Sequence, residues 1–253
     1  MNEKYSSQGL SIVAVTSEGE SQTEPWIEAK GAKYAYAYDR GGKLSKALGV
    51  SGIPNAVLVD PSGTIIWQGH PSSVTNELVE KAIVGSIKTP IYEWGGSAKT
   101  IKKAYLKGDF AKAIKAADKL GEKEELGKEI GTMLRGMVED RVAGFEKHLE
   151  AGNVLKAFEG AKGMSKAVKG LPEESKIKAL LTKISKDKDL KKALGTQQKL
   201  AEIMATEVRK KKECDACIKK LEKLLKGNEG TRTGELIKDA LKEMLATKAK
   251  LKR

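Results

Sequence analysis

The chain has 253 residues and a formal net charge of +13, with 47 Lys and Arg against 34 Asp and Glu. It contains only 2 cysteines, which excludes a fold held together by a framework of disulfides. No apolar run approaches the roughly 20 residues of a membrane span, and the first residues lack the basic-then-apolar layout of a secretory signal. As written, the chain is expected to be cytoplasmic, and exported if its true N-terminus lies further upstream.

Composition changes near Pro90–Gly96. Five of the 6 prolines precede residue 91, and all 3 tryptophans precede residue 95. Residues 1–95 hold 8 Lys and Arg against 10 Asp and Glu, whereas residues 96–253 hold 39 against 24. The sequence therefore predicts a mixed α/β domain over residues 1–90 and a Lys-rich, all-α domain over residues 91–253.

The first domain begins with a predicted helix at residues 2–8, followed by an apolar strand at residues 10–15. Residues 34–38 alternate Tyr and Ala, so their tyrosines share one face of a strand. This row is either half-buried sheet packing or an aromatic wall that faces a ligand. A short helix is expected at residues 43–48, and Thr75 caps a last helix that reaches about residue 87.

A predicted β-hairpin lies between these last two helices. Residues 56–59 form an almost unbroken apolar run, as expected of a strand that is covered on both faces. Residues 60–63 read Asp-Pro-Ser-Gly, which favours a tight turn, and residues 64–67 are β-branched and aromatic. The chain enters this hairpin through Gly52-Ile53-Pro54.

This order of motifs resembles the second half of a thioredoxin fold. It is most similar to the TlpA-type and peroxiredoxin-related branch of the thiol–disulfide oxidoreductases, over about residues 2–88. The resemblance implies that the Ile53–Pro54 peptide bond is cis. It also implies that Gly52, Ile53 and Pro54 form a substrate-binding loop, which in that family faces a catalytic Cys-x-x-Cys pair.

The resemblance further implies that the domain is N-terminally truncated. In that family a central strand and its Cys-x-x-Cys precede the helix that here ends near Gly9. The absent strand would lie between the strands at 10–15 and 56–59, and unpaired buried amides cost about 1–3 kcal/mol each. We therefore expect a partner, a second copy of the chain or another segment to fill the gap, or the two strands to pair directly.

From Gly96 onward the pattern is helical, with a weak internal repeat. Gly108-Asp109-Phe110 resembles Gly152-Asn153-Val154, and a fainter copy begins at Lys188. Each copy looks like the turn of a helical hairpin, and the first resembles a tetratricopeptide turn, although the unequal spacing argues against a regular array. The sequence predicts an irregular stack of helical hairpins, in which residues 189–226 form one long helix or two helices separated at Gly195.

Cys214 and Cys217 form the one thiol pair, and their flanks are typical of a helix interior. A spacing of three residues places both thiols on one helix face. Three interpretations stay open: small apolar residues on a helix seam, a catalytic redox pair whose thiolates are favoured by nearby Lys and Arg, and a metal site. A metal would need two further ligands, and His70 and His148 show no matching spacing. No metal and no cofactor is therefore predicted.

The basic half of the chain is compatible with two kinds of partner. Its Lys residues are interspersed with Glu and Asp along the helices, which is typical of a solvated face. Aromatic residues that could stack on bases are almost absent there. The sequence therefore favours an acidic protein partner over a nucleic acid.

The function follows from the thioredoxin resemblance and from the absence of its catalytic residues in the chain as given. We predict a non-catalytic thioredoxin-fold binding or scaffold protein, which could form homo-oligomers through its incomplete sheet. The alternative is a thiol–disulfide oxidoreductase that uses Cys214 and Cys217, or an N-terminal Cys-x-x-Cys that lies outside this chain.

Overall fold

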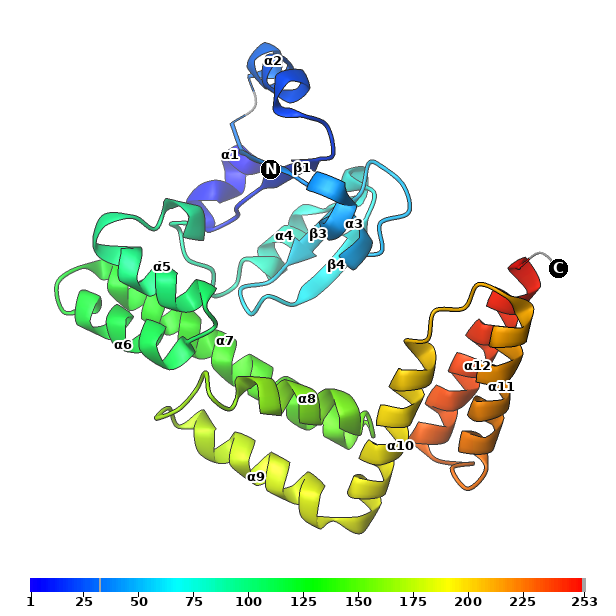
Figure 1. Cartoon of the computed structure of the whole chain (residues 1–253). Helices are drawn as coiled ribbons and strands as arrows, with labels where there is room; N and C mark the ends of the chain where they lie inside the picture. The colour runs from blue at the N-terminus through cyan, green and yellow to red at the C-terminus, as the bar shows by residue number, and fades with distance from the viewer. Residues whose placement is uncertain (32, 252–253) are drawn as a thin grey trace. The chain divides into compact units, whose positions relative to one another are not determined.

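The computed structural model describes residues 1–31 and 33–251. They form two compact units, Met1–Val138 and Glu139–Arg253, and Figure 1 labels most of their helices and strands. All strands of the described residues precede residue 70, and α-helices follow one another from Lys99 onward. The compositional boundary near Pro90 thus separates two types of secondary structure within the first unit, and the division into residues 1–90 and 91–253 stays a prediction.

The strands form two separate two-stranded sheets. Strand β1 (Val13–Thr16) pairs in parallel with β2 (Ala35–Tyr38), and Val13 lies opposite Ala35. Strand β3 (Ala56–Val59) pairs antiparallel with β4 (Ile65–Gly69), as the predicted hairpin requires. The alternative in which the strands at 10–15 and 56–59 pair directly is wrong, because β1 and β3 belong to different sheets.

The prediction that the strand at residues 56–59 is covered on both faces is also wrong. Every residue of the four strands is half-buried or exposed. Val13 and Val15 of β1 expose 46% and 45% of their surface, and Val59 of β3 exposes 49%. The reason is that each strand has a neighbour on one side only, so the sheets are too narrow to bury their central residues.

Short helices accompany the strands. They are α1 (Asn2–Tyr5), α2 (Glu20–Lys30), α3 (Lys43–Ala47) and α4 (Asn76–Ala82), with 3₁₀ turns at Ser6–Gln8, Arg40–Gly42, Pro71–Ser73, Ile91–Glu93 and Gly96–Ala98. Gly9 ends the first of these segments with φ = 105°, and Thr75 caps α4 by accepting the Leu78 N–H at 3.2 Å. Tyr5 is buried, and its hydroxyl donates to Glu80 at 2.6 Å, which fastens α1 to α4.

The first unit continues with α5 (Lys99–Leu106), α6 (Phe110–Gly121) and the first part of α7 (Glu125–Glu150). Asp109 begins α6 as its N-cap and accepts the Lys112 N–H at 3.0 Å, directly after Gly108 with φ = 71°. Helices α5 and α6 pack against each other, and their buried apolar residues include Ile101, Ala104, Phe110, Ala113, Ile114 and Ala117. This is the helical hairpin that the first repeat predicts.

The second unit contains the end of α7, then α8 (Val154–Met164), α9 (Glu173–Lys186), α10 (Lys188–Met204), α11 (Lys211–Leu225) and α12 (Arg232–Lys250). Helix α10 contacts the other four helices that follow α7. Gly195 lies inside α10, and the chain leaves the helix only after Met204. Both alternatives for residues 189–226 are therefore wrong in detail, because two helices form but Gly195 does not separate them.

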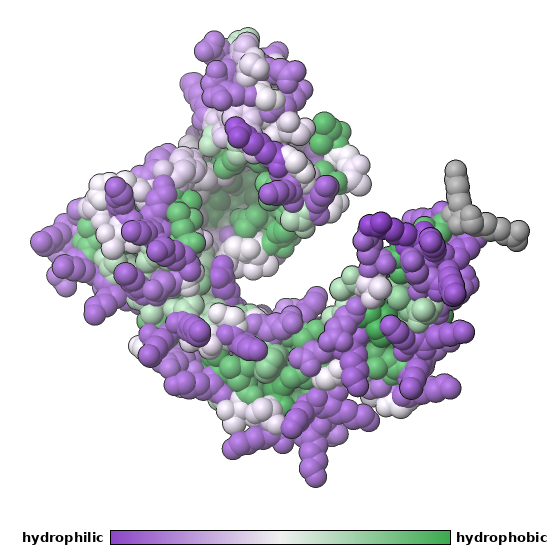
Figure 2. Space-filling view, viewed as in Figure 1, coloured by the Kyte–Doolittle hydropathy of each residue, from purple (hydrophilic) through white to green (hydrophobic). Residues whose placement is uncertain are grey.

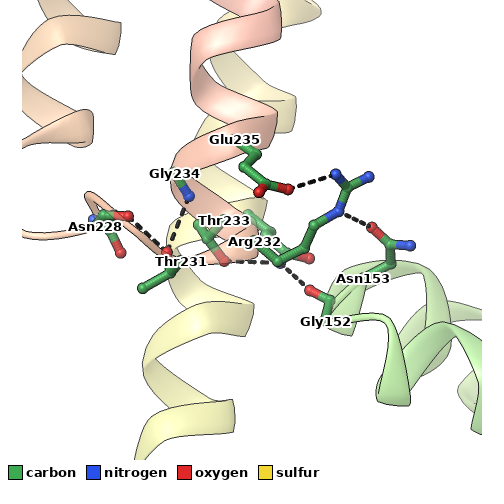
Figure 3. A network of polar contacts seen from close by, with 9 residues as sticks. Gly152, Asn153, Asn228, Thr231, Arg232, Thr233, Gly234 and Glu235 are labelled. Carbon is green, nitrogen blue, oxygen red and sulfur yellow. Dashed lines mark hydrogen bonds and ion pairs between the residues drawn. The ribbon is translucent and has the colours of Figure 1, made fainter.

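One buried side chain of α10 connects three helices. Gln197 is 4% exposed. Its Nε2 donates to the carbonyl of Gly152 at 2.8 Å and to the hydroxyl of Thr233 at 3.0 Å, while its Oε1 accepts the Leu155 N–H at 2.9 Å. Figure 3 shows the surrounding network, in which Arg232 at the start of α12 reaches Asn153 before α8.

Candidate functional site

The predicted substrate-binding loop, Gly52-Ile53-Pro54, connects α3 to β3 and lies at the surface. All three residues are exposed, and Ile53 exposes 92% of its surface. The Ile53–Pro54 peptide bond is cis, the geometry that the resemblance implies. A large apolar side chain that the described residues leave uncovered is available to a partner.

Gln68 of β4 holds this loop at both ends. Its Nε2 donates to the carbonyl of Leu48 at 3.1 Å and to Oδ1 of Asn55 at 3.2 Å. Leu48 precedes the loop and Asn55 follows it, so one side chain fixes the ends while the tip stays exposed. Sequence reasoning missed Gln68, because no motif in its neighbourhood marks it.

Asp39 fixes the segment that leads from β2 to the loop. One carboxylate oxygen accepts the N–H of Leu44 at 2.9 Å, and the other accepts the N–H and the hydroxyl of Ser45 at 3.0 and 2.8 Å. These hydrogen bonds, first from the Ser45 backbone and then from the Leu44 backbone, lower the pKa of Asp39. An Asp directly before a helical turn is the signal that could have found this residue.

Exposed apolar residues are frequent in the segment of the sequence that contains the loop. Figure 2 shows apolar side chains, in green, at the surface of the part that holds the strands. Eight large apolar residues there expose 37% or more of their surface: Val13, Val15, Trp26, Leu44, Ile53, Val59, Ile65 and Ile66. Exposed apolar residues indicate an interaction site where they form a contiguous patch.

The tyrosine row of residues 34–38 is half-buried. The rings of Tyr34 and Tyr36 stack, with centroids 5.2 Å apart. Burial raises the pKa of Tyr36 to about 12, and its buried hydroxyl has no hydrogen-bond partner among the described residues. These contacts favour sheet packing over a ligand-facing wall.

Cys214 and Cys217 lie far along the chain, on α11, and both thiols are free. Cys214 is 0% exposed and Cys217 is 2% exposed. They belong to a core cluster that α10, α11 and α12 share, with Leu200, Ile218, Leu221, Ile237, Ala240 and Met244. Thiol–disulfide exchange requires a thiolate that a second sulfur can approach, so this burial favours the packing interpretation of the pair.

Among the described residues, the histidines and these cysteines do not form a common metal site. The ring of His70 bonds the hydroxyl of Ser72 at 2.7 Å in the turn after β4, and His148 lies near the end of α7. Among the residues that the structure describes, no group of three His, Cys, Asp or Glu side chains is placed to hold a metal ion. No helix of the described residues is both long enough and apolar enough to cross a membrane.

The first part of the chain matches the model of a known protein family. Residues 1–68 match the model of the AhpC/TSA family, which supports a thioredoxin-like N-terminal region related to peroxiredoxins and thiol–disulfide oxidoreductases. The match includes the Gly52-Ile53-Pro54 loop and most of the β3–β4 hairpin. Neither the curated proteins nor the solved structures contain a match to this chain. Residues 1–68 contain no cysteine.

Proposed function

We propose that this protein is a non-catalytic binding protein, whose thioredoxin-like region presents the Gly52-Ile53-Pro54 loop to a protein partner. The observation that carries the proposal is the 92% exposure of Ile53 on a loop whose two ends are tied to Gln68. An apolar anchor on a pre-ordered loop loses little conformational entropy when it binds, which is how such residues contribute most to an interface.

The surroundings of the loop also favour a polypeptide as the ligand. Leu44, Val59, Ile65 and Ile66 are exposed apolar residues of the same region. Polar groups accompany them on the surface, such as Asn55 and Gln68, whose side chains bond each other. An apolar centre with a polar surround is the usual composition of a protein interface.

The alternative function is thiol–disulfide exchange by Cys214 and Cys217. The AhpC/TSA match of residues 1–68 favours redox chemistry for the protein, and Lys210, Lys211 and Lys212 precede the pair. Helix α11 would have to separate from α10 and α12 before either sulfur could meet a substrate, because the thiols are 0% and 2% exposed. We therefore place this function second.

An insulin-reduction assay separates the two functions. With dithiothreitol as the reductant, we expect the full-length protein to leave the rate of insulin precipitation unchanged, and the Cys214→Ser variant to behave in the same way. Acceleration by the wild-type protein that Cys214→Ser abolishes would establish the alternative function.

The Lys-rich helices support an acidic protein as the partner. Their exposed lysines are paired in part with carboxylates, as Lys178 is with Glu174 at 2.6 Å and Lys128 with Glu125 at 2.9 Å. A surface of this mixed kind attracts acidic proteins weakly. We expect the full chain to leave heparin at modest salt, whereas tight retention with a steep salt dependence would favour a nucleic acid.

A further inference from the structure

A groove lies on the second unit, lined by the end of α7, by α9 and by the start of α10. Its volume is about 610 Å³, within the range of about 300–1,000 Å³ that is typical of ligand sites. Its apolar floor consists of Leu149, Ala179, Leu180 and Leu190. Leu180 is 7% exposed, Leu149 and Leu190 are half-buried, and Ala179 is exposed. A ligand in the groove would therefore cover apolar surface on all three helices.

Charged side chains surround this floor, and carboxylates outnumber ammonium groups among them. The six charged residues that line the groove are Glu146, Glu150, Asp187, Asp189, Lys176 and Lys183. All six are exposed, and none of them forms an ion pair with another residue that the structure describes. The chain has a net charge of +13, so a groove with four carboxylates against two lysines is an acidic site on a basic protein.

The walls of the groove favour a helix as the ligand. They are themselves helices, whose backbone N–H and C=O groups bond within each helix. The backbone of an extended peptide would lose its water there and find few backbone partners, which is unfavourable. A helical ligand satisfies its own backbone groups, and it can place apolar side chains on one face at every third or fourth residue.

We propose that this groove binds a basic amphipathic helix of a partner protein, with the apolar face of that helix on the floor and its Lys or Arg residues beside Glu146 and Glu150. The apolar contact removes surface from water, and the complementary charges select the partner. An acidic helix would bring its carboxylates next to those of the groove, which disfavours it. The inference uses the second unit and is independent of the proposed function of the Gly52-Ile53-Pro54 loop.

Fluorescence anisotropy with the full-length chain tests the charge of the groove. The probe is a labelled peptide of about 18 residues, or about five helical turns, with Leu on one face and Lys on the other. The double variant Glu146→Gln/Glu150→Gln should bind it about threefold to tenfold more weakly, because exposed ion pairs contribute modestly. Glu222→Gln/Glu243→Gln is the matched control: both residues are exposed, on α11 and α12, and the net charge changes equally. The control should bind like the wild type. A wild-type protein that does not bind the peptide, or an equal loss in both double variants, overturns the proposal.

A second pair of variants tests the apolar floor. Ala179→Gln places a larger polar side chain in the groove and should weaken binding of the same peptide about fivefold or more. Ala246→Gln, at an exposed position of α12, is the matched control and should bind like the wild type. A counterpart peptide with Glu in place of Lys tests the other possible occupant, and Ala179→Gln should not alter its affinity. If Ala179→Gln weakens the acidic peptide and leaves the basic one unchanged, the groove binds an acidic helix and the proposal is wrong.

Discussion

Residues 1–90 and the unit Glu139–Arg253 differ in how much apolar surface they bury. In the described part of residues 1–90, the buried apolar side chains are Tyr5, Val79 and Ala82, and no strand residue is among them. In the second unit each helix contributes buried residues to a core, among them Val142, Val154, Ile177, Leu200, Leu221 and Ile237. The helices thus complete their packing within the chain, whereas the sheets leave apolar edges and loops exposed.

This difference assigns separate roles to the two regions. Burial of apolar side chains is the dominant source of folding stability, so the unit Glu139–Arg253 contributes more of it than residues 1–90 do. Exposed apolar groups such as Ile53 and Val15 stabilise the isolated chain little, but they become favourable when a partner covers them. The comparison supports the proposal that the binding site lies in residues 1–90, whose apolar residues the described chain covers least.

The largest expected effect is the difference between two truncations to alanine. Leu221 is 0% exposed in the core cluster of α10, α11 and α12, and Leu221→Ala should lower the free energy of unfolding by about 2–5 kcal/mol. Val15→Ala on β1 removes partly exposed atoms and should cost below about 1 kcal/mol. Urea denaturation followed by circular dichroism measures both losses. Equal losses would contradict the division of roles.

A second prediction concerns the buried Gln197. Gln197→Leu leaves the Leu155 N–H, the Gly152 carbonyl and the Thr233 hydroxyl without their partner, which should cost about 1–3 kcal/mol. The neighbouring Gln198 is exposed, and Gln198→Leu provides a matched control that should change the unfolding midpoint little. An unchanged free energy of unfolding in the Gln197→Leu variant would mean that the packing of α8, α10 and α12 does not depend on this network.

A third prediction concerns the substitution of Gly by Ala at two helical positions, where the change in stability should have opposite signs. A Cβ added at Gly195 meets no atom within 4 Å, so Gly195→Ala should stabilise the protein by about 0.5–1 kcal/mol. A Cβ added at Gly234 collides with the carbonyl oxygen of Asn228, so Gly234→Ala should destabilise it. Thermal melting distinguishes the two variants, and a fall in the melting temperature of Gly195→Ala would show that α10 is constrained there.

The smallest expected effect is local and depends on pH. The lowered pKa of Asp39 means that its ionised form stabilises the segment from β2 to α3 above the ordinary Asp pKa of about 3.9. This stabilisation should be lost as the pH falls through the still lower pKa of the folded protein. The amide signals of Leu44 and Ser45 in NMR spectra should therefore shift in acid. The Asp39→Asn variant should show no such transition, and a transition that persists in Asp39→Asn would assign it to another group.

Much of the architecture could be predicted from local patterns. The β3–β4 hairpin follows from the Asp60 turn, whose carboxylate accepts the N–H groups of Ser62 and Thr64 at 2.9 Å, and α6 follows from its Asp109 cap. The exposure of β1 could not be predicted. An apolar run indicates a strand that other residues can bury, but it does not indicate whether the same chain contains those residues. Gln68 and Gln197 act through residues far away in sequence, so no local pattern identifies them.

The central claim is that Ile53 is the anchor of a binding loop, and one binding measurement tests it directly. The probe is a permanently unfolded polypeptide with carboxymethylated cysteines and a fluorescent label, which excludes thiol chemistry. Fluorescence anisotropy should report binding to the wild-type chain, and Ile53→Ser should weaken it about tenfold or more, as expected for a central apolar anchor. Leu245→Ser on α12, where Leu245 is 52% exposed, is the matched control and should bind like the wild type. Equal affinity of the wild type and Ile53→Ser, or an equal loss in both variants, would contradict the account.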